Sequence, residues 1–229
     1  MSRINHQNRN AFLRHVLSSL AIVGVLLALY PVAQNVYTFW NQRSLQNQLA
    51  AAQKRLVKTS STRSSTTRSS TTRSSTSQSN KTKSSSIAQT AARPWPLTRM
   101  TCAEIGLDAI VVSGQDESSL KRGPGHDPQT AFPGERGNCV IAAHRNVYGS
   151  YFMRVDELLP GSIITLQTPD ASYRYSVIQT YTVADTDTHI RRPPTDPSSP
   201  PLLTLFTCTI PRTATRVVVT AQLLGDDAP

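Results

Sequence analysis

The first 93 residues of this 229-residue chain contain no aspartate or glutamate, although they contain 13 lysines and arginines. The remaining residues hold all 14 acidic side chains against 11 basic ones, so the pI of about 10 describes the N-terminal part alone. Aromatic residues are also few, at 6%. The basic tract lacks the interleaved aromatics and groove-docking motifs of nucleic-acid-binding proteins, so we expect no nucleic-acid partner.

Cysteine is scarce as well. The chain has three, Cys102, Cys139 and Cys208, and none belongs to a C-x-x-C pair. Their spacing matches no common zinc site, so we expect no metal and no cofactor. An odd number of cysteines leaves at least one thiol without a disulfide partner in the chain, and a disulfide between Cys102 and Cys139 is a possibility that the sequence does not decide.

Charge is absent from "VLSSLAIVGVLLALYPVAQNV", residues 16–36. As a helix rising ~1.5 Å per residue, this segment is about 31 Å long and can cross a bilayer. Arg3, Arg9 and Arg14 precede it and are expected to keep residues 1–15 cytoplasmic. A cleavable signal peptide is the alternative, but no small-x-small site follows. We therefore predict a single-pass anchor in the cell membrane, with the C-terminal part extracellular.

Residues 37–58 are rich in helix formers and are predicted to extend the anchor as a helical stalk. The next segment, 59–93, is predicted to be a disordered linker, because residues 59–86 contain no apolar side chain that could build a core. As a flexible coil this linker would span roughly 30 to 35 Å. We interpret it as a solvated spacer, and binding of its arginines to wall or lipid phosphates is the alternative.

Residues 94–229 are predicted to form mainly strands, separated by clusters of Gly, Pro and Asp. The expected strands are 100–105, 109–113, 138–143, 162–168, 172–184, 202–207 and 216–224. The strongest helix signal is 150–161, with Ser150 as its N-cap and Pro160-Gly161 as its stop. Seven or eight strands in about 130 residues indicate an all-β domain, either a small closed barrel or a sandwich.

A cysteine, Cys208, ends one predicted strand, and Arg216 begins the next across a short turn. A hairpin would make the two residues neighbours. A guanidinium beside a thiol favours the nucleophilic thiolate and can donate hydrogen bonds to an oxyanion. On the residues alone, a buried structural Cys208 and an Arg216 paired with an acid stay open as alternatives.

The stretch "GNCVIAAHRN", residues 137–146, contains a predicted strand that ends near His144, where a polar turn begins. An imidazole titrates near neutral pH and can carry the proton that a cysteine nucleophile must exchange. His126 and His189 are competing candidates, and the residues alone do not exclude them.

In this order, "IAAHRNVYGSYF", "TLFTC" and the arginine that opens the last strand resemble the His, TLxTC and Arg signatures of the sortase family. The segment "LKRGPGHDPQTAFPGERGN", residues 120–138, is similar to the one that precedes the histidine in class E sortases, with class D next. The likeness covers residues 100–224. Ala143 stands where the family often has glycine, and the turn before Arg216 is short.

The resemblance implies an all-β fold, an eight-stranded sortase-type β-barrel with short helices, preceded by a transmembrane helix and a disordered linker. Residues 94–229 would then be the catalytic domain. It implies that Cys208 attacks the threonine carbonyl of an LPxTG- or LAxTG-like sorting signal, that His144 transfers protons, and that Arg216 holds the peptide and stabilises the oxyanion. Thr207 would contribute to that stabilisation, and the loop 185–201 would recognise the substrate.

The partners implied by the resemblance are secreted proteins that carry a sorting signal, and an amine acceptor in the form of a peptidoglycan precursor or a pilin lysine. A pilin-polymerising sortase is one alternative, in which "PWPL" at residues 94–97 would act as a lid. A cysteine hydrolase and a non-catalytic peptide-binding barrel are the others.

Overall fold

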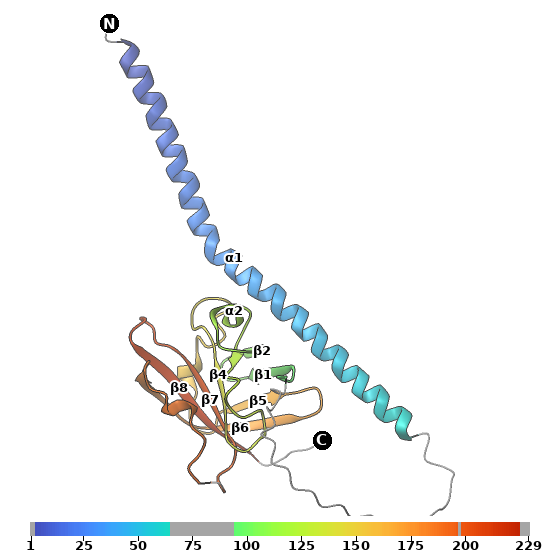
Figure 1. Ribbon diagram of the computed structural model, residues 1–229. Coiled ribbons are helices and arrows are strands. Elements are labelled where there is room, and N and C mark those ends of the chain that lie inside the picture. Colours follow the sequence, from blue (N-terminus) through green and yellow to red (C-terminus); the bar gives the residue numbers. More distant parts are fainter. Residues whose placement is uncertain (1–2, 65–93, 197, 225–229) are drawn as a thin grey trace, which may run out of the picture.

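A long N-terminal helix lies beside a β-barrel in the computed structural model, which describes residues 3–64, 94–196 and 198–224 (Figure 1). The helix, α1 (Arg3–Ser64), joins the predicted anchor and stalk without interruption and contains Pro31. An internal proline removes one backbone hydrogen bond, which accounts for a bend of the kind seen in α1. Residues 59–64, expected in the linker, are helical, and the rest of the predicted linker, 65–93, lies outside the described residues.

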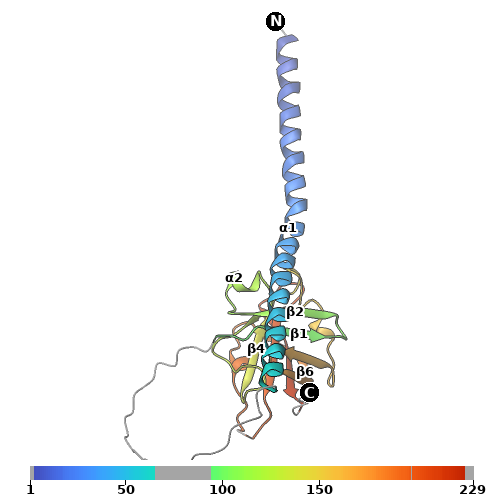
Figure 2. The same ribbon diagram turned by 90° about the vertical axis from the view of Figure 1, so that its right-hand side faces the viewer.

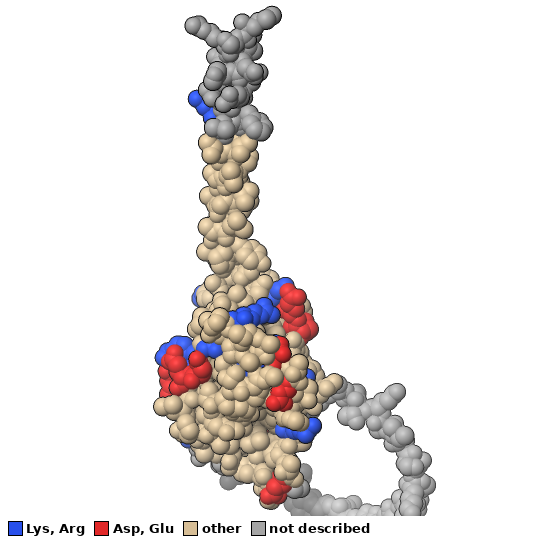
Figure 3. Space-filling model, turned by 90° about the vertical axis from the view of Figure 1, so that its left-hand side faces the viewer, with Lys and Arg blue, Asp and Glu red and all other residues tan. Residues whose placement is uncertain are grey.

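The N-terminal part of α1 is long and apolar enough to cross a membrane. Its apolar side chains within residues 16–36 are exposed on all sides of the helix, and Figure 3 shows no charged group along this stretch. A helix that is apolar all round has a lower free energy in the hydrocarbon core of a membrane than in water. This finding fits the predicted membrane anchor.

Eight strands close into a barrel in the order β1-β2-β3-β4-β7-β8-β6-β5, which confirms the expected all-β fold. Helical elements within the barrel domain are short, being α2 (Glu117–Leu120) and the 3-10 turns η1 (Val155–Glu157) and η2 (His189–Arg191). The strands are β1 (Thr98–Cys102), β2 (Leu107–Ser113), β3 (Gly125–His126), β4 (Asn138–Ala142), β5 (Ile163–Gln167), β6 (Ser172–Ala184), β7 (Leu202–Cys208) and β8 (Thr215–Leu223).

The barrel interior is filled by alternate residues of its strands, because successive side chains of a strand point to opposite faces. In β7 the inward pair is Leu203 and Leu205, and both are fully buried in the core. The neighbouring strands contribute on the same pattern: Cys139 and Ile141 from β4, and Val217, Val219 and Ala221 from β8. The intervening residues of these strands therefore face away from the core, and this sets the direction of the candidate site.

The predicted helix at 150–161 is wrong. The segment forms a series of turns around η1, and Ser150 has a φ of 49°, which is left-handed and unlike the extended backbone of an N-cap. Its apolar residues Phe152, Val155 and Leu158 are buried in the core. Core contact at three-residue spacing therefore produces the helix-like pattern without a helix.

The part of α1 that follows the apolar segment packs on the barrel, and Figure 2 shows it lying across β1 and β2. The buried Gln42 side chain accepts from Ile110 N at 2.6 Å and donates to the carbonyl oxygens of Ile110 at 2.9 Å and Arg122 at 2.8 Å. A Cβ at Gly123 would collide with the Gln42 amide, so the glycine leaves the space that the glutamine fills. The predicted stalk is thus a docked helix.

Candidate active site

Three neighbouring strands of the barrel, β4, β7 and β8, bring the predicted site residues to one region. Strand β4 runs parallel to β7, and β7 pairs antiparallel with β8. Because Leu205 and Val217 point into the core, the alternation turns Cys208 and Arg216 to the outer face of the barrel wall. In Figure 1 the turn between β7 and β8 lies at the same end of the barrel as α2.

Cys208 and Arg216 are direct cross-strand partners, which confirms that a hairpin makes them neighbours. Opposed residues of an antiparallel pair project from the same face. Both side chains are half-buried, so the nucleophile candidate is not a core residue. The thiol and the guanidinium therefore share one open edge of the sheet.

The guanidinium of Arg216 makes one hydrogen bond and one long ion pair with the described residues. Its Nη1 donates to the Thr215 carbonyl at 3.1 Å, and its Nη2 lies 3.8 Å from Oδ2 of the exposed Asp185. The expected alternative, an arginine paired with an acid, is thus also present, although the separation is long for a hydrogen bond. Most of the guanidinium's donors remain available to a peptide or an oxyanion.

The strand β4 carries His144 to the level of Cys208. The last register pair between β4 and β7 is Ala142 with Phe206, and His144 and Cys208 each follow two residues later. The pairing continues past the strand end, because Ala143 N donates to the Phe206 carbonyl at 3.4 Å. The histidine and cysteine candidates, far apart in sequence, therefore follow the ends of two neighbouring parallel strands at the same level.

The hydroxyl of Thr207 donates to the Ala143 carbonyl at 2.7 Å and is buried. Thr207 points inward, on the opposite side of β7 from Cys208. This hydrogen bond ties the end of β4, just before His144, to the strand of the candidate nucleophile. The contact supports a positioning role, because the proton that an oxyanion would need is already donated.

The imidazole of His144 is half-buried, and its Nε2 is buried without a hydrogen-bond partner among the described residues. Burial lowers the pKa of His144, and the positive charges of Arg212 and Lys121 lower it further, while Glu117 acts in the opposite direction. The tilted ring of Tyr148 lies 5.3 Å away, centroid to centroid. The histidine is accordingly neutral near pH 7, with one nitrogen free for proton exchange.

Sequence reasoning missed Arg145, which links the turn after β4 to the strand that carries Cys208. Its side chain is 9% exposed, its Nη2 lies 2.6 Å from Oδ2 of Asp156, and its Nη1 donates to the Cys208 carbonyl at 3.5 Å. A buried charge needs such partners. The only signal in the sequence was an arginine directly after a strand-end histidine.

The competing histidines lie elsewhere. His126 is buried in β3, its ring stacks on Trp95 at 3.9 Å, and its Nε2 is 3.0 Å from the Ala131 carbonyl. The indole of Trp95 also donates to the Val111 carbonyl at 3.1 Å, so the predicted lid segment packs beside β2 and β3. His189 is exposed in η2, with Nδ1 3.4 Å from Oδ1 of Asp187. Neither histidine adjoins the end of β7.

The loop 185–201 is anchored to the barrel at its middle. The amide of the buried Asn138 in β4 donates to the carbonyl oxygens of Ile190 and Arg192 at 2.9 and 3.1 Å. Arg191 adds an ion pair of 3.2 Å with Asp127. These contacts partly preform the loop that would border a bound peptide, which lowers the entropy lost on binding.

The three cysteines are free thiols, and the described residues contain no group of three or more His, Cys, Asp and Glu side chains that could hold a metal. Cys102 and Cys139 are buried and unpaired. Burial raises the pKa of Cys102 to about 11 and that of Cys139 further still. Both thiols are therefore protonated at neutral pH, and Cys208 is the accessible candidate for a nucleophile.

Comparisons with known proteins bear on the family and the fold of this chain. The family model of the sortase domain matches residues 99–224. Sortase D of Bacillus subtilis is 30% identical over 87 residues, which are 38% of this chain and 42% of the relative, so the chain spans less than half of that protein.

Two solved structures are similar in fold. The sortase D5 transpeptidase of Clostridium perfringens is 29% identical, with a TM-score of 0.52 over 57% of this chain and 79% of that one. Sortase E of Streptomyces avermitilis is 28% identical, with a TM-score of 0.52 over 57% of this chain and 89% of that one. The two classes are thus about equally similar to this chain.

Proposed function

Because the chain belongs to the sortase family, we propose that it is a membrane-anchored cysteine transpeptidase that joins secreted proteins to an amine of the cell wall. Its substrate is an LPxTG- or LAxTG-like sorting signal, and its acceptor is the amine of a peptidoglycan precursor. In this proposal residues 1–15 are cytoplasmic, 16–36 span the membrane and the barrel is extracellular. The observation that supports the proposal is the strand register, which pairs Cys208 with Arg216 and brings the residue two positions after β4, His144, to the same end of the barrel wall.

In the first half of the reaction the neutral imidazole of His144 takes the proton of the Cys208 thiol. The resulting thiolate adds to the threonine carbonyl carbon, and the carbonyl oxygen becomes an oxyanion. Arg216 donates hydrogen bonds to the oxyanion or to the peptide beside it. The C–N bond then breaks, and the departing amine takes a proton from the imidazolium of His144. The product is a thioester on Cys208 and a neutral imidazole.

In the second half an incoming amine attacks the thioester carbonyl and loses a proton to His144. The C–S bond breaks, the new amide leaves, and the thiolate is restored beside an imidazolium. The two steps replace one difficult amide exchange. The lowered pKa of His144 favours the neutral form that accepts the proton in this half.

We assign the chain to the class E-like, housekeeping type because residues 120–138 resemble that class. The comparable similarity to sortases D and E leaves class D as the second candidate. The Trp95 side chain stacks on His126 and does not favour a lid over Cys208. This placement makes a pilin-polymerising enzyme the less supported alternative.

The test uses the full chain in lipid nanodiscs with LPxTG and LAxTG peptides, and mass spectrometry of the products with and without diglycine as an amine. We expect cleavage by the parent protein, ligation when the amine is present, and no product with Cys208→Ala. The matched control, Cys102→Ala, removes a buried thiol and should retain activity. Retained activity of Cys208→Ala would overturn the assignment, and a product that is always hydrolysed would identify a hydrolase.

A further inference from the structure

The barrel contacts α1 before the helix has left its apolar segment. Asn35, within the uncharged span 16–36, accepts a hydrogen bond from Gly149 N at 3.2 Å. The buried Thr38, two residues beyond that span, donates to the Lys121 carbonyl at 2.9 Å. If the span crosses a bilayer, the loop around Gly149 lies at the depth of the outer headgroups, since two helical residues advance only ~3 Å.

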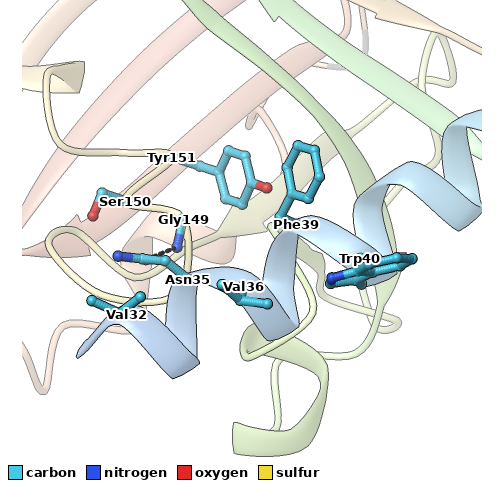
Figure 4. A pocket seen from close by; sticks show the side chains of 8 residues that line it. All are labelled: Val32, Asn35, Val36, Phe39, Trp40, Gly149, Ser150 and Tyr151. Atoms are coloured by element: carbon cyan, nitrogen blue, oxygen red, sulfur yellow. Dashed lines mark hydrogen bonds between the residues drawn. The ribbon is translucent and has the colours of Figure 1, made fainter. Parts of the chain in front are cut away.

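An apolar cavity of about 650 Å³ opens at this junction. Figure 4 shows Val32, Val36, Phe39 and Trp40 on the side of α1, and Tyr151 on the barrel side. The polar side chain of Asn35 is already bonded to Gly149 N (Figure 4). The wall formed by Val32 and Val36 is continuous with the surface that would face lipid.

The loop that forms the other wall has an uncommon backbone. Tyr148, Gly149 and Ser150 have consecutive φ values of 49°, 86° and 49°. The left-handed region is unfavourable for a non-glycine residue, and such strain persists only where neighbouring contacts hold it. Here the hydrogen bond that Gly149 N donates to Asn35 Oδ1 holds the loop, and the side chain of Tyr151 faces the cavity.

The part of α1 beside the cavity has the composition of a membrane interface. Tyr37 and Trp40 are 52% and 70% exposed, and aromatic side chains of this kind settle at headgroup level. The Arg43 guanidinium lies 5.7 Å from the Phe39 ring centroid, where its charge can meet an anionic headgroup. Lys121 is on the same side, although it is shared with Glu117 through an ion pair of 2.6 Å.

We propose that this cavity seats an acyl chain of an outer-leaflet phospholipid, and that the loop 148–151 rests on the bilayer. The proposal rests on the membrane anchor of the proposed function but not on transpeptidation. Because Tyr148 lies beside His144, the bilayer fixes the height of the catalytic end of the barrel. Membrane-held precursors then meet the site without a long reach.

Photo-crosslinking tests the proposal. The full chain is placed in nanodiscs of phosphatidylglycerol and phosphatidylethanolamine that contain a phospholipid with a diazirine in its acyl chain. After irradiation, mass spectrometry maps the labelled peptides. We expect label on the peptide that contains Gly149 and Tyr151, several-fold above that on β8, which lies opposite β2 in the closed barrel, whereas α1 contacts β1 and β2. Label confined to α1 would overturn the proposal.

Two variants report on the cavity itself. Val36→Trp fills it and should lower labelling of the loop several-fold, whereas Val25→Trp, an exposed position earlier in the same span, should leave it unchanged. Equal labelling in both variants would contradict a lipid in the cavity. Displacement of the label by an added sorting peptide with its apolar tail would also contradict a lipid in the cavity. So would cross-linking of the loop to a second copy of the chain.

The measurement does not depend on the reaction. Cys208→Ala should label like the parent protein, so a failure of the transpeptidase assay leaves the lipid result intact. Conversely, an active enzyme without label on the loop would refute this inference and leave the proposed function standing.

Discussion

Replacing Gln42 by alanine removes the side chain that joins α1 to the barrel most directly. Along β2, strand β3 pairs with Val112 and Ser113 but not with Ile110, so the Ile110 backbone faces an edge that β3 does not cover. Gln42 satisfies the Ile110 N–H and C=O, and donates to the Arg122 carbonyl as well. The variant leaves all three backbone groups without this partner.

The three hydrogen bonds are worth about 1 kcal/mol each, since a net value of that size is typical of an intramolecular hydrogen bond. The docked helix should therefore lose roughly 3 kcal/mol, which corresponds to a little more than a hundred-fold change in the docking equilibrium. The core of the barrel does not depend on Gln42. Opening should be local and not global.

Amide hydrogen exchange of the full chain in nanodiscs measures this loss. Protection of the Ile110 amide should fall by about a hundred-fold in Gln42→Ala, given the free energy above, while the core amide of Val219 should keep its protection. The matched control is Gln48→Ala, an exposed glutamine of the same helix whose amide donates to Ser44 Oγ at 3.5 Å and not to the barrel among the described residues. If the Ile110 amide exchanges alike in both variants, Gln42 does not hold the helix on the barrel.

Three further predictions concern the site and its charges. Arg216→Lys should lose most of the activity, as lysine cannot reproduce the fork of donors; near-normal kcat/KM would make the arginine structural. Arg212→Gln should raise the pKa of His144 by removing a positive charge, and Glu117→Gln should lower it, as an NMR titration of the ring would show; shifts of the same sign would contradict the electrostatic reasoning. Burial lowers the pKa of His126, so its contribution to stability is fully present above the unfolded value of about 6.5 and is lost as the pH falls; denaturant midpoints at pH 7.5 and 5.5 measure this loss, which should shrink in His126→Gln.

Local sequence patterns predicted most of the strands and the hairpin between β7 and β8. Alternation and turn residues predicted most strands, and the hairpin placed Cys208 opposite Arg216 because only a short turn separates them. The two-residue β3 carries no pattern long enough to detect. The helix expected at 150–161 failed because its apolar spacing reflects contact with the core.

Local sequence patterns could not predict that His144 and Cys208 lie at the same end of neighbouring strands. This expectation came from the family resemblance, and the tertiary structure gives its physical basis. The two residues adjoin only because β4 and β7 pair in parallel, and no local rule predicts which distant strands become neighbours. The contacts of Arg145 with Cys208 and of Asp185 with Arg216 have the same origin. Each joins side chains whose proximity depends on how the barrel closes.

The docking of α1 on the barrel shows most clearly which features the sequence determined and which the tertiary structure decided. Composition alone determined an uncharged segment long enough for a bilayer and a helical continuation after it, because hydropathy and helix propensity are properties of neighbouring residues. Only the tertiary structure decided that this continuation docks on β2, since a glutamine must find a free strand edge and a glycine that leaves room for it. These requirements join positions about 70 and 80 residues apart, so they exist only once the barrel has formed.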